Sequence, residues 1–465
     1  MNKENYKSAL NKITASEAFQ QKTAELLKNP PKQKGGIQME KKNKVLKFVL
    51  VPALAIVLVC TLLFSNVFSS FGAAQACVNL MDGVAAGKNG TDGAVSPKFI
   101  RPAADFSVRL FQKSVEQNRN SLISPVSVYL ALGMTANGAD GGTLKQFENV
   151  LGGGLSIDEL NKSYAKLANQ FSTIKDGKLE IANSIWYRNK NLTVEKSFLQ
   201  KNADYFGAGA FQLDFSKKDT PDIINSWVKE HTGGKIDKMV ENISEDNMMY
   251  LINALFFEAD WMKAYPEYSV KNQDFHTADG TETVPFMSSK ERYLADEKST
   301  GMIKLFKDKR FAFAAILPNE GVSMKDYVNQ MTGESFLKLM QSESEEEANV
   351  LLPKFRYDYT VKLNDPLKAM GLTDAFDGDL SDFSKMGHAA GGNLYISEVQ
   401  HKTFIQVDQK GAKAGAVTEV AIASRSAMPI APPKEVVLDR PFVYAIIDTQ
   451  TKLPIFIGTV NDPTK

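Results

Sequence analysis

Residues 411–426, with the sequence Gly-Ala-Lys-Ala-Gly-Ala-Val-Thr-Glu-Val-Ala-Ile-Ala-Ser-Arg-Ser, alternate like a β-strand but have a composition that disfavours one. One alternating set is small at the front and β-branched behind, and the other contains Lys413 and Glu419, as expected for a strand with one buried face. Because Gly and Ala are depleted in strands, we expect this segment to join a sheet only where neighbouring strands receive it. The bond between Arg425 and Ser426 at its end is one that a trypsin-like protease would cleave.

The composition is that of a large globular protein. The chain has 465 residues, 43% of them hydrophobic and 23% charged, which allows one large domain or two to three ordinary ones. The formal net charge of +1 argues against a nucleic-acid binder, because such proteins show a strong basic excess. Only two cysteines are present, and Cys60 lies in an apolar stretch, so neither a disulfide framework nor a cysteine-rich metal site is predicted.

The sequence has no pattern of catalytic or metal-binding residues. The four histidines are not spaced as metalloprotease ligands, and neither a nucleophile-elbow motif nor a phosphate-binding loop occurs. Four aspartates cluster with the wrong spacing for a calcium loop and indicate a solvated acidic turn. They are Asp374, Asp377, Asp379 and Asp382. We therefore expect no catalytic residues, no metal and no cofactor, and a protein that is not an enzyme.

A membrane segment is predicted near the N-terminus. Residues 48–67 are apolar and uncharged and match the ~20 residues that cross a bilayer. Residues 1–47 contain eleven Lys and four Glu without Arg or Asp, which predicts that they lie in the cytoplasm and that everything after the segment lies outside. We expect a single-pass protein of a bacterial cell membrane with its large domain outside the cytoplasm.

Two further interpretations of this region stay open. The sequence Ala-Ala-Gln-Ala before Cys77 loosely resembles a lipoprotein cleavage site, so the alternative is an export signal that is cleaved or lipidated there. We favour the uncleaved anchor, because the basic front of 47 residues is long for a signal peptide. Met39 follows a Lys-Gly-Gly sequence that a ribosome-binding site can encode, so a start at Met39 is an alternative to Met1.

The rest of the chain is predicted to be a spacer and one domain. Residues 68–96 are rich in Gly, Ala, Ser and Asn and predict a flexible spacer with a reach of roughly 25 to 30 Å. No second linker follows, so residues 97–465 are expected to form one domain. Helices are expected at residues 106–116, 125–136 and 222–231, and strands at residues 178–187, 250–257, 394–396, 404–407, 435–438, 442–448 and 454–460. This distribution predicts an α+β domain with several antiparallel sheets.

Seven short motifs occur in order along this domain. They are Asn120-Ser-Leu-Ile-Ser124-Pro125-Val-Ser127 ahead of a helix; Asn225-x-Trp227-Val228 with Gly233-Gly234-Lys235-Ile236; Leu251-Ile-Asn253-Ala254-Leu-Phe-Phe257 with Trp261; Pro353-Lys354-Phe355; Leu367-x3-Gly371-Leu372-x2-Ala375-Phe376; His401-Lys402; and Asp439-Arg440-Pro441-Phe442 with Pro454-Ile-Phe456-Ile-Gly458. Each motif alone is weak. Together, and in this order, they closely resemble the signatures of the serpin family of serine protease inhibitors.

The resemblance implies a fold and a mechanism. The serpin fold has three β-sheets, about eight to nine helices and an exposed reactive-centre loop, which residues 411–426 would supply. In the family's suicide-substrate mechanism, a serine protease cleaves this loop, and the freed loop enters the central sheet while the protease stays attached. Small residues at the start of the loop, called the hinge, allow rapid insertion. They are Gly411, Ala412, Ala414, Gly415 and Ala416.

Counting forward from the hinge at the spacing usual in the family predicts the reactive bond between Arg425 and Ser426. Counting back from Phe442 reaches Ile430 and Ala431 instead, because the return limb is longer than usual. We favour Arg425, since the inserted length is mechanically constrained and the return limb is not. Arg425 predicts that the partner is a trypsin-like serine protease, and we expect the inhibitor itself to be a monomer. The alternative is a non-inhibitory member of the fold that is cleaved without trapping protease.

Two further groups of residues take their roles from the resemblance. The shutter is a polar cluster beneath the central sheet that controls whether its strands part. Its members are Ser124, Ser127, Asn253 and His401. The breach is the top of the sheet, where the loop enters, and it contains Trp261, Lys354 and Gln409. Gln409 stands where many members carry Glu, so a hydrogen bond to Lys354 is expected in place of an ion pair.

Overall fold

The computed structural model describes residues 77–87, 93–172, 176–344, 346–390, 392–412 and 434–465. The chain divides into two units, Met1–Ala74 and Gln75–Lys465, and the described residues all belong to the second. The predicted segments 1–47 and 48–67 lie outside the described residues. Among the residues that are described, no helix is long and apolar enough to span a bilayer.

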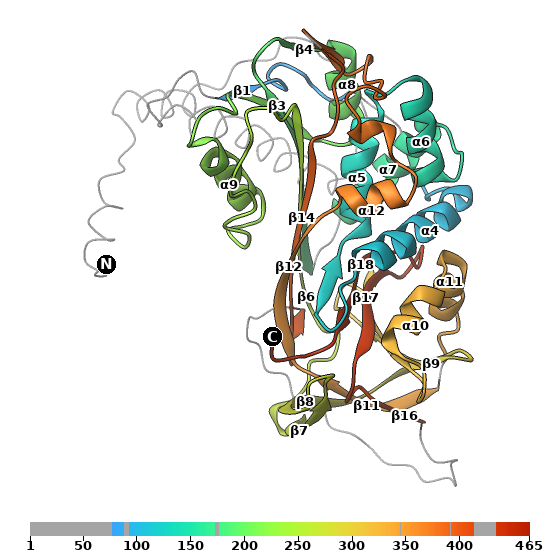
Figure 1. Ribbon diagram of the computed structural model, residues 1–465. Helices are drawn as coiled ribbons and strands as arrows, with labels where there is room; N and C mark the ends of the chain where they lie inside the picture. Colours follow the sequence, from blue (N-terminus) through green and yellow to red (C-terminus); the bar gives the residue numbers. More distant parts are fainter. Residues whose placement is uncertain (1–76, 88–92, 173–175, 345, 391, 413–433) are drawn as a thin grey trace, which may run out of the picture. The chain divides into compact units, whose positions relative to one another are not determined.

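A seven-stranded sheet forms the middle of the domain (Figure 1). Its strands, in spatial order, are Cys77–Asn79 (β1), Gly209–Leu213 (β5), Gly177–Arg188 (β3), Met249–Asp260 (β6), Gly411–Ala412 (β15), Glu398–Val407 (β14) and Phe355–Lys362 (β12). β6 and β14 are parallel neighbours, and the short β15 lies between them at one end.

The other strands form a nine-stranded sheet and a two-stranded sheet. Along the larger sheet the order is Lys434–Val437 (β16), Glu347–Pro353 (β11), Thr281–Ala295 (β8), Ser299–Leu305 (β9), Phe311–Pro318 (β10), Phe442–Asp448 (β17), Pro454–Val460 (β18) and Ser121–Ile123 (β2), with Val270–His276 (β7) paired to β8. Leu192–Val194 (β4) pairs with Gly387–Ala389 (β13). The prediction of an α+β domain with several sheets is confirmed.

Nine α-helices are found in the described part of the chain, together with two 3₁₀ turns at Glu267–Ser269 and Asp374–Phe376. The helices are Pro97–Ser114 (α4), Pro125–Ala136 (α5), Gly141–Gly152 (α6), Ile157–Ser172 (α7), Lys196–Tyr205 (α8), Thr220–His231 (α9), Met324–Gln330 (α10), Gly333–Gln341 (α11) and Asn364–Ala369 (α12). α4 to α7 gather on one side of the seven-stranded sheet, and α9 lies on the other (Figure 1).

Helix α5 forms the core beneath the sheet. The side chain of Ser124 accepts a hydrogen bond from the backbone N–H of Ser127, and Pro125 occupies the first turn, where its missing N–H costs nothing. Every residue of α5 is buried, as expected for a helix that is apolar all round. The cap therefore fixes the start of a buried helix and holds two predicted shutter residues at that position.

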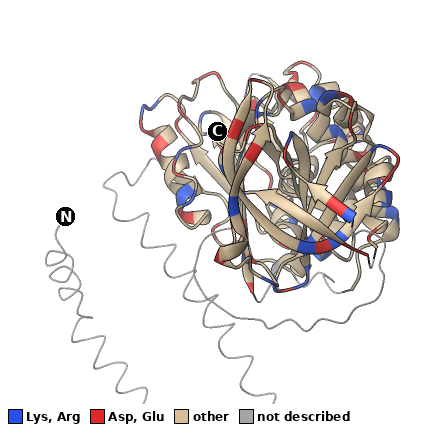
Figure 2. Cartoon of the chain, turned by 90° about the horizontal axis from the view of Figure 1, so that it is seen from below, with Lys and Arg blue, Asp and Glu red and all other residues tan. Residues whose placement is uncertain are grey.

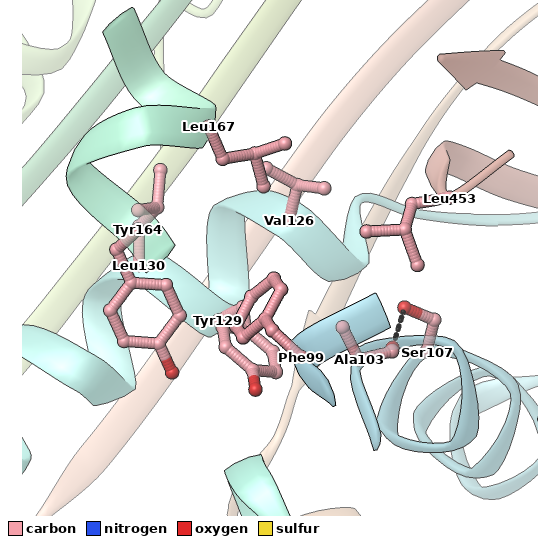
Figure 3. A pocket seen from close by; sticks show the side chains of 9 residues that line it. All are labelled: Phe99, Ala103, Ser107, Val126, Tyr129, Leu130, Tyr164, Leu167 and Leu453. Atoms are coloured by element: carbon pink, nitrogen blue, oxygen red, sulfur yellow. Dashed lines mark hydrogen bonds between the residues drawn. The ribbon is translucent and has the colours of Figure 1, made fainter. Parts of the chain in front are cut away.

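The packing on both faces of the seven-stranded sheet is aromatic. On the outer face, Trp227 of α9 is buried and makes an edge-to-face contact with Trp186, with ring centroids 5.9 Å apart. On the inner face, Tyr129 and Tyr164 line a cavity of about 10 Å³ among α4, α5 and α7 (Figure 3). That volume holds at most one water, so this cavity is a packing gap and not a ligand site.

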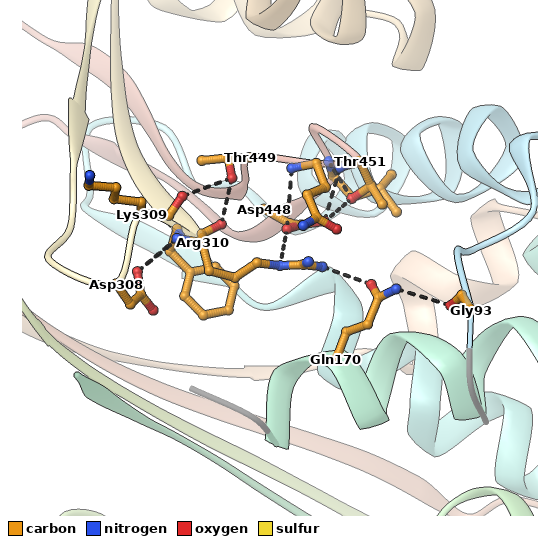
Figure 4. A network of polar contacts seen from close by, with 11 residues as sticks. Gly93, Gln170, Asp308, Lys309, Arg310, Asp448, Thr449 and Thr451 are labelled. Atoms are coloured by element: carbon orange, nitrogen blue, oxygen red, sulfur yellow. Dashed lines mark hydrogen bonds and ion pairs between the residues drawn. The ribbon is translucent and has the colours of Figure 1, made fainter. Parts of the chain in front are cut away.

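A partly buried polar network joins the C-terminal end of α7 to the β17–β18 hairpin (Figure 4). Arg310 Nε lies 2.6 Å from the fully buried carboxylate of Asp448, and Arg310 also donates to Gln170 Oε1 on α7 at 2.8 Å. Gln170 Nε2 donates to the carbonyl oxygen of Gly93 at 3.3 Å. The residues that precede α4 are therefore tied to the domain body.

The structure differs from the sequence prediction at residues 394–396, which are not a strand. Leu394 and Ile396 are buried, and this burial produced the apolar alternation that predicted a strand. Their backbone groups form hydrogen bonds with residues that are not in a neighbouring strand. Ser381 Oγ donates to the Leu394 carbonyl, and Ile396 N–H donates to the Ala375 carbonyl. The strand begins only at β14.

The predicted spacer, residues 68–96, also differs from a free linker where it is described. Cys77 of β1 pairs with Leu213 of β5, and Leu80 N–H donates to the Ala210 carbonyl oxygen at 2.8 Å. The sheet edge offers unpaired backbone groups, and these bind a short segment whatever its local strand propensity. The residues before α4 thus extend the seven-stranded sheet.

Candidate functional site

The strand β15 contains the first two residues of the predicted hinge. Gly411 and Ala412 pair antiparallel with Asp260 and Ala259 of β6, and Ala412 also pairs with Val407 of β14. Ala412 is only 2% exposed. The start of the hinge is therefore already inside the seven-stranded sheet, between the two strands that the inserted loop would have to separate.

Glycine is required at position 411 by close approach of the neighbouring strand. A Cβ atom built on Gly411 would lie 2.2 Å from the carbonyl oxygen of Ala259 and 2.8 Å from Cα of Asp260. Both contacts are with backbone atoms of β6, which cannot move aside without breaking the ladder. The pairing of β15 with β6 therefore depends on the missing side chain at this position.

A tight turn leads the chain from β14 into β15. The carboxylate of Asp408 accepts hydrogen bonds from the backbone N–H groups of Lys410, at 2.9 Å, and Gly411, at 3.4 Å. The Asp408 N–H donates to the Gly411 carbonyl oxygen at 3.1 Å. An aspartate that caps its own turn in this way presets the reversal of the chain.

Trp261 and Tyr265 hold this turn from the side of β6. The indole Nε1–H of Trp261 donates to the Asp408 carbonyl oxygen at 2.8 Å, and its backbone N–H donates to the Lys410 carbonyl at 2.9 Å. The backbone N–H of Tyr265 donates to the Gln409 carbonyl at 2.8 Å. Trp261 thus contacts the turn that leads into β15 through both its side chain and its backbone.

Lys354 and Gln409 both lie in the described part of the chain, and their side chains do not form the expected hydrogen bond there. Lys354 is held through its backbone N–H, which donates to the Pro285 carbonyl oxygen at 2.9 Å. Gln409 is held through its backbone carbonyl by Tyr265 instead. Backbone contacts therefore fix the breach in this structure, and the side-chain pair predicted for it does not form.

The four predicted shutter residues lie in one buried hydrogen-bonded chain. Asn253 Nδ2 donates to Ser127 Oγ at 2.5 Å, and Asn253 Oδ1 lies 2.6 Å from Nδ1 of His401. The backbone N–H of Ser124 donates to Nε2 of His401 at 3.0 Å. The chain links α5 to β6 and β14, and all four residues have no exposed surface.

The imidazole of His401 is neutral in this cluster. Because Ser124 N–H donates to Nε2, the ring proton lies on Nδ1 and is donated to Asn253 Oδ1. Complete burial lowers the pKa of His401 to about 3. The imidazole therefore joins two elements by hydrogen bonds and does not exchange protons near neutral pH.

Asn183 of β3 belongs to the same cluster and was missed by the sequence analysis. Its Oδ1 accepts a hydrogen bond from Asn253 Nδ2 at 2.5 Å. Asn183 pairs with Asn253 across β3 and β6, and Asn253 pairs with His401 across β6 and β14. The only signal in the sequence was a lone amide within the apolar strand predicted at residues 178–187.

Several predicted site residues lie outside the described residues. They are Ala414, Gly415, Ala416, Arg425 and Ser426, and the alternative pair Ile430 and Ala431 lies there too. Within the described chain, no group of three or more His, Cys, Asp or Glu side chains is arranged to hold a metal ion. The described part of the site thus consists of the neighbouring strands β6 and β14, with β15 between them at one end and a buried polar cluster across them.

The comparisons with known proteins agree with this geometry. A family model described as "Serpin (serine protease inhibitor)" matches residues 101–463. Serpin-Z7 of Hordeum vulgare is 33% identical over 74% of this chain and 90% of its own length. Alpha-1-antiproteinase S of Cavia porcellus is 30% identical over 80% of this chain and 92% of its own length.

Solved structures show the same fold. The thermophilic serpin Tengpin in its native state is 44% identical and superimposes with a TM-score of 0.79, covering 83% of this chain and all of Tengpin. Tengpin in its latent state is also 44% identical, with a TM-score of 0.70 over 79% of this chain and 99% of the other. The fold is the serpin fold, with its sheets and helices as the sequence predicted. The chain belongs to the serpin family.

Proposed function

We propose that this serpin inhibits trypsin-like serine proteases as a suicide substrate, with cleavage between Arg425 and Ser426. The observation that carries the proposal is β15. Gly411 and Ala412 already occupy the position of a new strand between β6 and β14, so insertion of the rest of the loop continues an existing pairing. The costly step of opening the top of the sheet has been taken in the uncleaved chain.

Further insertion of the loop replaces the hydrogen-bond ladder between β6 and β14 by two ladders, one on each side of the new strand. β6 and β14 pair directly in parallel from Tyr250 to Leu255 and from Glu398 to Thr403, and this ladder has to open. The inserted strand would pair antiparallel with both neighbours, as β15 does, and antiparallel pairing is slightly more stable per residue. About a dozen inserted residues gain on the order of 10 kcal/mol before ordering costs. That gross gain is comparable with the ~5 to 15 kcal/mol that holds a domain folded, which is the scale of energy that distorting a captured protease requires.

The composition of the hinge favours inhibition over cleavage without trapping. Ala412 is buried between β6 and β14, and the following hinge residues are Ala or Gly at three of the next four positions. Small side chains enter a sheet without displacing its core.

Mixing the purified protein with trypsin and separating the products on a denaturing gel tests the proposal. We expect a covalent band at the summed mass of the inhibitor and trypsin. Trypsin whose active-site serine has been blocked is the matched control and should give no such band. A cleaved inhibitor without the covalent band would overturn the proposal in favour of the non-inhibitory alternative.

We also propose that the serpin domain lies outside the cytoplasm, tethered by residues 48–67. The packing of Cys77 favours the uncleaved anchor over lipidation at this residue. Cys77 is a partly buried member of β1, and burial raises the pKa of its thiol to about 11. A lipidated Cys77 would have to leave this position. Cell fractionation of the full chain and of a variant without residues 48–67 tests the tether; equal membrane association of both would contradict it.

A further inference from the structure

A basic hollow lies between the two points where the reactive loop leaves the domain. It has a volume of about 770 Å³ and is lined by residues 263–273, by β8, by Lys304 of β9 and by β11. On one side, Tyr265 bonds to Gln409, which leads into β15. On the other side, Glu347 of β11 precedes Ala348, the partner of Lys434, where the described chain resumes after the loop. The hollow therefore adjoins both described ends of the chain that flank the loop.

The charges of the hollow are dominated by lysine. Four lysines and two glutamates line it: Lys263, Lys271, Lys290, Lys304, Glu291 and Glu347. Lys304 is buried, forms an ion pair with Glu291, and lies over the Tyr265 ring with Nζ 4.3 Å from the ring centroid. The other three lysines are exposed, and no ion pair joins them to any described residue. Basic and acidic residues are interspersed over this end of the domain (Figure 2), but in the lining of the hollow the three exposed lysines outnumber the one exposed carboxylate, Glu347.

Exposed apolar side chains flank the same lysines. Tyr268 is 84% exposed and lines the hollow, and Met262, next to Lys263, is 40% exposed. These are two of four large apolar side chains that are exposed in the described part of the domain. Tyrosine and methionine are enriched on surfaces that bind another protein, and charged side chains lie at the rim of such surfaces.

The hollow does not have the features of a small-anion site. Its one buried cation, Lys304, already has Glu291 as its partner. The unpaired lysines are on the rim, where solvent screens their attraction for a single small ion. A large surface with many carboxylates would instead meet all three lysines and the Tyr268 ring at once.

We infer that this hollow is a second contact surface for the target protease, and that it selects proteases with a carboxylate-rich surface beside their active site. The inference rests on the proposed function, because the loop brings the protease to this position. Rim charges of this kind act mainly on the association rate. They add a preference among proteases that all accept Arg425.

The test measures association rate constants with anionic and cationic trypsin, which share a preference for arginine and differ in net charge. Replacing Lys263, Lys271 and Lys290 together by Glu should slow anionic trypsin about tenfold or more at low ionic strength and speed cationic trypsin. High ionic strength should reduce both effects. The matched control replaces three exposed lysines elsewhere, Lys145, Lys196 and Lys218, by Glu; it makes the same change in net charge.

The outcomes separate this inference from the proposed function. If the unaltered serpin forms no covalent complex with either trypsin, the proposed function fails. If complexes form but the hollow variant and the control variant change the rates equally, the hollow has no specific role and the inference is overturned. Thermal unfolding and the final yield of complex should match the unaltered protein in both variants, so that a rate change reports binding.

Discussion

The Nδ1–H of His401 donates a hydrogen bond to Oδ1 of Asn253 across 2.6 Å, and the two residues face each other in the parallel pairing of β14 and β6. These are the strands between which β15 already lies. Extending β15 into a full strand has to break this bond. In the proposed mechanism, the shutter therefore opposes insertion at a point beyond Gly411 and Ala412.

Native-state stability should fall as pH is lowered through the titration of His401. The unfolded imidazole has a pKa near 6.5 and the native one about 3. Between these values the unfolded state binds a proton that the native state does not, so falling pH destabilises the native state by about 1.4 kcal/mol per pH unit. At pH 5 this contribution is roughly 2 kcal/mol. Urea unfolding at pH 7 and pH 5 should show it in the natural protein and not in His401→Gln.

A second measurement tests the same account without a variant. The imidazole C–H resonance of His401 in the folded protein should keep its neutral chemical shift between pH 7 and pH 5. A His401 resonance that titrates near its ordinary pKa would contradict the buried, neutral ring.

Removing the Asn183 amide should weaken the shutter. Asn183→Ala leaves one donor of Asn253 without its acceptor in a buried site, which costs about 1 to 3 kcal/mol. We expect a lower unfolding midpoint in urea and faster spontaneous loop insertion on warming. Asn189→Ala, an exposed change just beyond β3, is the matched control. Equal midpoints for the two variants would show that the Asn183 contact contributes nothing.

A methyl group at position 411 should expel β15 from the sheet. In Gly411→Ala the new Cβ would lie 2.2 Å from the Ala259 carbonyl oxygen, so the pairing with β6 cannot survive. Amide hydrogen exchange at Ala259 to Asp260 should become faster, and the number of inhibitor molecules consumed per trapped protease should rise. Gly142→Ala, where the nearest atom is a flexible carboxylate oxygen at 3.4 Å, is the control. Unchanged exchange in Gly411→Ala would disprove the steric argument.

A long charged side chain at position 412 should turn the inhibitor into a substrate. Ala412 is buried between β6 and β14, and Ala412→Arg would place an unpaired cation in that site. Loop insertion should become slower than hydrolysis of the covalent intermediate. Trypsin is therefore expected to cleave the variant and to dissociate from it in active form. Lys413→Arg keeps the charge at the next position and should trap normally. Trapping by Ala412→Arg at the unaltered yield would contradict insertion past this point.

The sequence predicted the fold through ordered motifs and strong periodicity, and it missed what depends on partners distant in the chain. The helix at residues 125–136 and the last strands were located because apolar periodicity is local. Asn183 gave no local sign that it faces Asn253, since register between strands is set by the folded sheet. β1 and β15 have few residues and weak strand propensity, and each forms only because a sheet edge or gap receives it.

The breach shows the same limit at the level of one contact. Lys354 and Gln409 were expected to bond because of their positions in the family pattern. The backbone N–H of Tyr265 satisfies the Gln409 carbonyl instead, and Lys354 is fixed through Pro285. The position of these two residues is therefore determined by backbone hydrogen bonds, which the family pattern of side chains does not predict.

The most direct test of the central claim is mass spectrometry of the products formed when the full chain meets trypsin. The account predicts a covalent complex that contains the chain up to Arg425, together with a released peptide that begins at Ser426. A released peptide beginning at Ala431 would move the reactive bond to the alternative site. Cleavage at Arg425 with no covalent complex would contradict the account, because loop insertion would then be slower than release of the protease.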